Sequence, residues 1–318
     1  MNLPVLPPHF GAHRYFRYHD LLTQRYGGRV QKVSLNAGFT CPNRDGTLGR
    51  RGCTFCNNAG FTPAYLQRPL GLTEQLDEGI GRLRRRYPQT RHFFAYFQAY
   101  TNTYGELEQL KSQYELALSH PDIDGLVIGT RPDCLPESLL AYLSALAKDF
   151  PLEVEIGIES CDDAVLARVN RGHDFATSAD AIRRVAAHGL PVTGHLLFGL
   201  PGESRADQLQ AAALLSALPL ASLKLHQLQL IRGTALASQW RRNSAAVPLF
   251  SPADYIELVI DFLERLSPDI AIQRIGSEVP ARLRLAPAEA MPLSVLQQNV
   301  AARMLERETW QGRLYRVA

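Results

Sequence analysis

The chain has 318 residues, of which 46% are hydrophobic and 20% are charged, with a formal net charge of +3. This composition is typical of a globular protein with one large α/β domain and an appendage. No segment approaches the roughly 18 consecutive apolar residues of a membrane span, and the first ten residues lack the apolar run of a secretory signal. We therefore expect a cytoplasmic protein with no membrane partner. The small basic excess permits a nucleic-acid partner without requiring one.

Hydrophobic patterns predict alternating strands and helices from residue 30 onward. Strands are predicted at residues 30–36, 92–99, 125–129, 152–158, 191–199 and 222–231, with a further one at 270–275. Helices are predicted at residues 72–87, 105–119, 136–149, 162–169, 178–189, 203–218, 252–266 and 292–308. This alternation favours a parallel sheet with crossover helices. Since a closed barrel needs eight such units, six of them predict an α/β fold of the open, partial (β/α)6 barrel type.

The chain divides into three predicted parts. Residues 1–29 form an N-terminal cover segment, in which aromatic residues are spaced for packing against a surface rather than for a helix. We expect this segment to cover the open edge or the mouth of the barrel. Residues 30–235 form the core domain, and residues 236–318 form a C-terminal extension on the substrate side.

Three of the five cysteines, Cys41, Cys53 and Cys56, lie in a loop rich in Gly, Asn and Asp after the first strand. An odd, low cysteine count disfavours disulfides. A structural zinc site needs four ligands, and no nearby residue is an obvious fourth. An iron–sulfur cluster with three thiolates and one open iron fits better, because cluster irons favour thiolate. Three thiols without any ligand remain an alternative.

Polar residues follow several of the predicted strands. The ends of parallel strands meet at one rim, where α/β proteins gather their reactive groups, so we expect these side chains to face the cysteine loop. They are Gln98, Tyr100, Asn102, Thr103, Thr130, Arg131, Asp133, Glu159 and Ser160, with His195 on the fifth strand. Each also has a structural interpretation: Glu159 could pair with a neighbouring arginine, and a histidine between apolar neighbours is often a core residue.

The cysteine loop and four later motifs resemble the radical S-adenosylmethionine (SAM) superfamily. The loop reads Cys-Pro-Asn-Arg-Asp-Gly-Thr-Leu-Gly-Arg at residues 41–50 and Gly-Cys-Thr-Phe-Cys at residues 52–56. Eleven residues separate the first two cysteines, where the commonest spacing is three. A lengthened gap also occurs in the group that includes the Elongator catalytic subunit and related coproporphyrinogen-oxidase-like proteins. The further motifs lie at residues 129–133, 157–160, 170–173 and 199–203.

The resemblance implies two cofactors and a set of binding residues. The three cysteines would hold a [4Fe–4S] cluster whose fourth iron binds SAM, and reductive cleavage of SAM would yield a 5′-deoxyadenosyl radical. The resemblance places residues 98–103 at the SAM amino group and Glu159 and Ser160 at its ribose. It places Arg171 near the SAM carboxylate and the backbone around Phe55 beside adenine. Arg171 could instead bond a helix C-terminus.

The substrate is less defined than the chemistry. By analogy with the Elongator-like group, the most concrete hypothesis is modification of a wobble uridine in tRNA, with a reducing electron donor of the flavodoxin or ferredoxin type. Arg44, Arg50 and Arg51 in the cysteine loop, with the arginines of residues 82–86, predict a patch for phosphate. The alternatives are a radical SAM enzyme for a small-molecule metabolite, and a non-enzymatic zinc-binding or cluster-binding regulatory protein.

Overall fold

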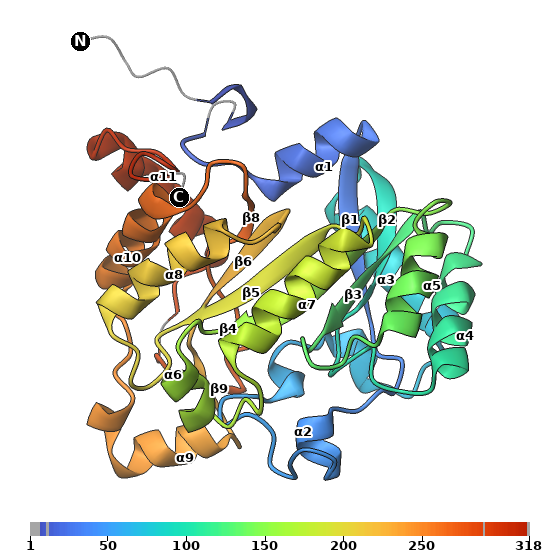
Figure 1. The fold of residues 1–318 in the computed structure, drawn as a ribbon, viewed down its shortest axis with the longest axis horizontal. Helices are drawn as coiled ribbons and strands as arrows, with labels where there is room; N and C mark the ends of the chain where they lie inside the picture. The colour runs from blue at the N-terminus through green and yellow to red at the C-terminus, as the bar shows by residue number, and fades with distance from the viewer. Residues whose placement is uncertain (1–6, 11–12, 289, 317–318) are drawn as a thin grey trace.

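Seven parallel strands form one curled sheet, an open barrel whose spatial order follows the chain order (Figure 1). The structure is a computed structural model that describes residues 7–10, 13–288 and 290–316. The strands are β1 (Arg29–Leu35), β2 (Thr90–Phe97), β3 (Gly125–Thr130), β4 (Leu152–Glu159), β5 (Val192–Phe198), β6 (Ser222–Gln227) and β8 (Ala271–Arg274). The predicted class, an α/β partial barrel, is confirmed.

Helices cover the outer face of the sheet, as right-handed crossovers require (Figure 1). They are α3 (Leu72–Arg86), α4 (Leu107–Leu118), α5 (Glu137–Leu146), α6 (Asp163–Arg168), α7 (Phe175–Ala187), α8 (Arg205–Ser216) and α10 (Pro252–Arg265). Except for α6, their apolar stripes are buried against the strands in one continuous core, to which Leu76, Leu139 and Ile182 contribute fully buried side chains. Helix α6 buries Val165 in a second cluster. The outer face is therefore a packing face, and the chemistry lies inside the barrel.

Two predicted boundaries shift for identifiable reasons. Helix α7 begins three residues before the predicted start, because the Asp174 carboxylate accepts a hydrogen bond from Thr177 N at 2.8 Å and so caps the helix there. The predicted strand at residues 222–231 ends at Gln227. Strand β7 (Leu230–Ile231) instead pairs antiparallel with β9 (Arg284–Ala286) in a separate small sheet. The further strand predicted at residues 270–275 is β8, the seventh of the main sheet.

The N-terminal segment contains a helix, α1 (Tyr18–Tyr26), so the prediction that it has none was wrong. Two residues of this helix, Tyr18 and Leu22, lie one turn apart on its buried face. Arg17 bridges Ile272 of β8, so the segment covers the open edge of the sheet. One buried cluster fills the end of the barrel where the strands begin; it contains Phe10, Phe16, Tyr18, Leu22, Val30, Phe94, Tyr96, Val127 and Ala271. The mouth at the opposite end stays open.

The C-terminal part completes the wall beside β6 and β8. It contains α9 (Ala235–Arg242), α10 and α11 (Leu293–Glu306). Beyond α11, Gln311 bonds both ends of the chain together: its side-chain oxygen accepts from Phe16 N at 3.0 Å, and its amide donates to Ser267 O at 2.7 Å. Among the residues described, no helix combines the length and apolarity needed to cross a bilayer.

Candidate active site

The cysteine loop leaves the end of β1 and folds back over the mouth of the barrel. A short helix, α2 (Pro42–Asp45), follows Cys41, and a tight turn joins Cys53 to Cys56, whose N–H donates to Cys53 O at 3.1 Å. Gly52 has φ of +67° and lies against the Arg44 side chain, so a larger residue there would be strained. All three cysteines line one cavity of about 620 Å³, within the usual size range of cofactor sites.

Two hydrogen-bond donors lie beside one of the three thiols. Cys53 Sγ lies 3.7 Å from Asn43 Nδ2 and 3.6 Å from Arg171 Nη1. Such donors tune the sulfurs of iron–sulfur sites. The donor set therefore fits three thiolates at an open-cornered cluster.

Arg171 is a charged group beside this thiol. Its Nη2 donates to Gly157 O at 2.6 Å and lies 3.8 Å from the Glu159 carboxylate, while Nε has no partner among the described residues. Burial opposes its charge, but Cys53 and Glu159 more than offset this and raise the pKa of Arg171. Arg171 therefore stays cationic beside the cysteines.

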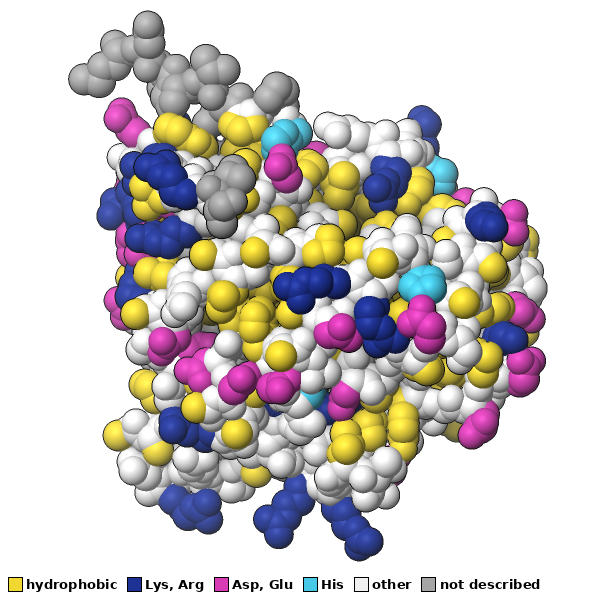
Figure 2. Space-filling view, in the orientation of Figure 1, with side chains coloured by type: hydrophobic (Ala, Val, Ile, Leu, Met, Phe, Trp, Pro, Cys, Tyr) yellow, Lys and Arg dark blue, Asp and Glu magenta, His cyan; other side chains and the backbone are white. Residues whose placement is uncertain are grey.

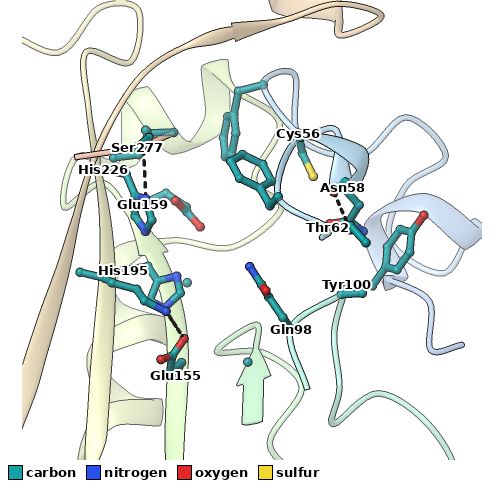
Figure 3. A pocket seen from close by; sticks show the side chains of 18 of the residues that line it. Cys56, Asn58, Thr62, Gln98, Tyr100, Glu155, Glu159, His195, His226 and Ser277 are labelled. Carbon is teal, nitrogen blue, oxygen red and sulfur yellow. Dashed lines mark hydrogen bonds and ion pairs between the residues drawn. The ribbon is translucent and has the colours of Figure 1, made fainter. Parts of the chain in front are cut away.

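Two cavity residues have a backbone that L-amino acids rarely adopt. Tyr100 after β2 has φ of +64°, and Glu159 at the end of β4 has φ of +72° next to an irregularity in the β4–β5 pairing. This conformation aims the Glu159 side chain into the cavity (Figure 3). A Cβ at Gly157 would come within 2.7 Å of Arg171 Nη2 and 2.8 Å of Glu159 Oε1. Strain held in this way is typical of functional sites.

Most of the residues predicted from the sequence to bind cofactor line this cavity together with the cysteines. They are Phe55, Gln98, Tyr100, Thr130, Arg131, Glu159, Arg171 and His195. Figure 3 shows Gln98 and Glu159 pointing into the space between Cys56 and His195. One rim thus collects side chains from β2, β3, β4 and β5, as expected for parallel strands.

Four predicted residues do not line the cavity, and their structural bonds explain why. Asn102 is fully buried and donates to Phe97 O and Gly129 O, at 3.0 and 2.8 Å. Thr103 bonds Thr130, and Ser160 bonds Glu203. Asp133 accepts from Arg131 Nη2 and Nε, at 2.8 and 2.9 Å. These side chains hold the loops that follow the strands and do not line the cavity, so their contact with a cofactor stays a prediction.

A group of polar residues that was not predicted from the sequence lies deeper in the barrel. We call it the lumen floor; it comprises Lys32, Tyr96, Glu155, Lys224, His226, Gln273 and Arg274, together with His195, all of which line the same cavity. Except for the adjacent pair Gln273 and Arg274, these residues alternate with other residues along the strands, so they share the inner face of the sheet. Polar residues at alternate positions of otherwise apolar strands were the available signal.

The comparisons with known proteins agree with this geometry. A model of the radical SAM superfamily matches residues 44–215, and a model of the radical SAM C-terminal domain matches residues 220–306. Uncharacterized protein YtqA of Bacillus subtilis is 33% identical over 302 residues, covering 94% of this chain and 93% of that protein. Protein YhcC of Escherichia coli K12 is 38% identical over 268 residues, covering 84% of each.

Two further matches are more distant. A tRNA uridine(34) acetyltransferase of Dehalococcoides mccartyi is 29% identical over 180 residues, covering 56% of this chain and 38% of that protein. The structure of Elp3 from the archaeon Methanocaldococcus infernus superposes with a TM-score of 0.65 at 18% identity, over 89% of this chain and 64% of that one. The latter supports the fold alone.

The chain belongs to the radical SAM superfamily. It is an enzyme of that class, and its cofactors are the [4Fe–4S] cluster and SAM that the superfamily uses.

Proposed function

We propose that Cys41, Cys53 and Cys56 hold the cluster, and that SAM lies in the cavity beside them. When bound, the cluster and SAM together supply the one-electron chemistry that starts the reaction on the substrate. The protein's own contribution is to position these groups and to balance their charge. The support is the set of three thiols on one cavity wall with two donors directed at Cys53.

The other rim residues suit the polar parts of SAM. Glu159 offers carboxylate oxygens to the ribose hydroxyls, and Gln98, held by Ser34 Oγ at 2.8 Å, offers an amide to the amino acid part. Arg171 balances the negative charge of the cluster thiolates. Tyr100, with 41% of its surface exposed, forms an apolar wall at the mouth.

For the substrate we propose tRNA. A relative named as a tRNA uridine(34) acetyltransferase and another named as Elongator complex protein 3 share 29% identity with parts of this chain. The observation that carries the proposal is a group of exposed arginines around the cavity mouth. We call them the mouth arginines: Arg50, Arg51, Arg232, Arg241, Arg242 and Arg282.

The mouth arginines come from three segments that meet at the mouth. Leu236 N at the start of α9 donates to Thr54 O in the cysteine loop at 2.9 Å, and Arg232 N donates to Leu283 O at 2.7 Å. None of their side chains forms an ion pair with another described residue. Figure 2 shows basic side chains projecting from the edge where Figure 1 places α2 and α9. Unpaired cations of this kind favour a phosphate backbone.

The arginines of α3 do not extend this surface, so that part of the predicted phosphate patch was wrong. They lie at the C-terminal end of α3, near the start of β2 and away from the mouth. Arg82 pairs with Glu78 at 2.6 Å, and Arg84 pairs with Asp122 at 2.7 Å. Their neighbours Arg85 and Arg86 are exposed and form no ion pair with a described residue, although the Arg86 guanidinium lies 5.3 Å from the centre of the Tyr87 ring; both serve as controls away from the mouth.

Binding of bulk tRNA to the anaerobically reconstituted full chain, measured across a range of salt concentrations, tests the proposal. We expect retention at low salt and a log–log salt slope that falls by roughly 1.5 to 2 when Arg50 and Arg51 are both changed to Gln. The Arg85→Gln, Arg86→Gln control should keep the wild-type slope. Absence of retention at low salt, or equal loss in the control, would exclude the mouth as a tRNA-binding surface and favour a small-molecule substrate.

A further inference from the structure

The lumen floor lies across the cavity from the cysteines, beyond the space assigned to SAM. In Figure 3, Glu155, His195 and His226 stand on one side of the cavity, and Cys56 stands on the other. Nothing in the proposed binding of cluster or SAM uses this group. Its charges are therefore available to the substrate.

Glu155 lies at the centre of the floor, and hydrogen bonds from its neighbours already occupy its carboxylate oxygens. Its carboxylate accepts from Lys224 at 2.7 Å, Lys32 at 2.8 Å, His195 at 2.9 Å and Gln273 at 3.3 Å, as well as from Tyr96. Burial opposes its charge, yet Lys224 and Lys32 hold its pKa well below the ordinary value. Glu155 is thus a fixed anion that orients its neighbours.

Arg274 is the floor cation that lacks an acid. On β8, Arg274 is paired with Lys224 of β6, while Ile272 is paired with Leu223. Gln273, between them, has no partner on β6, and this irregularity lets Gln273 and Arg274 both line the cavity. No ion pair or side-chain hydrogen bond joins Arg274 to any residue that the structure describes. Glu278, the nearest acid along the chain, accepts instead from Leu293 N at 2.9 Å.

The remaining carboxylate near the floor is also engaged. Glu153 accepts from Lys32 at 3.3 Å and from Tyr18 and Thr193. Of the three cations in the floor, Lys32 and Lys224 have carboxylate partners, whereas Arg274 has none among the described residues. Both floor histidines have a lowered pKa, chiefly because of burial, and add no charge near neutral pH. Arg274 therefore faces the cavity without a carboxylate partner, in a wall that also includes Glu278.

We propose that Arg274, supported by Lys224 and His226, forms a subsite for a carboxylate group of the substrate. A half-buried guanidinium with both arms free is suited to bidentate recognition of a planar oxyanion. Because Glu278 also lines the cavity, a singly charged carboxylate fits this wall better than a phosphate monoester dianion, which carries a second negative charge. The inference rests on the proposed function only in that the cavity receives the substrate; it does not depend on RNA binding at the mouth.

The test uses small probes of equal shape and different charge. Binding of benzoate, benzamide and phenyl phosphate to the reconstituted, SAM-loaded full chain would be measured by calorimetry. We expect benzoate to bind about tenfold or more tightly than benzamide, in line with the strength of a charged hydrogen bond. Arg274→Gln should abolish this preference, Arg274→Lys should keep part of it, and Arg85→Gln should keep all of it.

Several results would overturn the subsite. The first two are an equal affinity for benzoate and benzamide, and a preference for benzoate that survives Arg274→Gln. The third is tighter binding of phenyl phosphate than of benzoate. The fourth is a preference for benzoate seen only without SAM, which would assign Arg274 to the SAM carboxylate. Circular dichroism and SAM affinity report folding of the variants. Arg274→Gln should also retain tRNA as the wild type does, so failure of the subsite and failure of tRNA binding are separate results.

Discussion

Changing Glu155 to Gln tests whether the lumen floor is held together by one buried charge. The Glu155 side chain is fully buried, and it compensates two lysines whose side chains are 15% and 9% exposed. Removing one partner of a buried ion pair typically costs 3 to 5 kcal/mol, about the cost of an uncompensated buried charge. Lys32 keeps Glu153 as a partner at 3.3 Å, so most of the loss falls on Lys224.

The expected magnitude for Glu155→Gln is about 3 kcal/mol, at the low end of that range. Lys224 can relieve part of the cost by losing its proton, because burial already lowers its pKa to about 8. Urea unfolding at pH 7, followed by circular dichroism, measures the change as a shift of the midpoint. The loss should shrink at pH 9, where Lys224 is largely neutral.

The matched control is Glu78→Gln. Glu78 also pairs with two cations, Arg68 and Arg82, but their side chains are 59% and 49% exposed. Exposed pairs of this kind contribute at most about 1 kcal/mol. If Glu155→Gln destabilises the protein no more than Glu78→Gln, or if its effect is the same at pH 7 and pH 9, the account of the floor is refuted.

Three further outcomes are expected. Cys41→Ala should fold but lose most of the reconstituted iron and the visible absorption of the cluster. Cys134 is buried and lies outside the cavity, so Cys134→Ala should bind a full cluster. A full cluster in Cys41→Ala would contradict the ligand assignment. Glu159→Ala should keep the cluster and weaken SAM binding about tenfold, the loss expected for hydrogen bonds to a charged acceptor; an unchanged dissociation constant would leave Glu159 with a structural role. Lys224 should titrate near pH 8 by NMR. The free energy of unfolding should rise between pH 8 and 10, because in this range the unfolded chain still holds the proton that the folded lysine has lost. Lys224→Met should flatten that rise.

The fold was predictable because its signals are local. Buried parallel strands are apolar runs of strand length, and the helices between them have apolar stripes, so alternation alone indicated a partial barrel. Helix α1 was missed because its two buried residues, Tyr18 and Leu22, pack against the end of the barrel, and this long-range contact is not visible in the local sequence pattern. The length of the strand after Ser222 was likewise decided by pairing with β9, which is remote in sequence.

The site was predictable where motif and strand end coincide. Cys41, Cys53 and Glu159 follow directly from the loop composition and from the ends of β1 and β4. Asn102 and Ser160 occupy equally suggestive positions, yet backbone carbonyls and a carboxylate take up their side chains. Sequence proximity to a strand end does not reveal which way a side chain turns, so only the structure separates the two groups.

The sealed end of the barrel constrains the order of events during turnover. The buried cluster under α1 fills one end of the barrel, and Arg17 bridges β8 at the open edge of the sheet, so we expect ligands to enter and leave through the mouth. A macromolecule seated on the mouth arginines would block that passage. We therefore expect an ordered kinetic mechanism in which SAM enters first and its spent fragments leave only after the large product has departed.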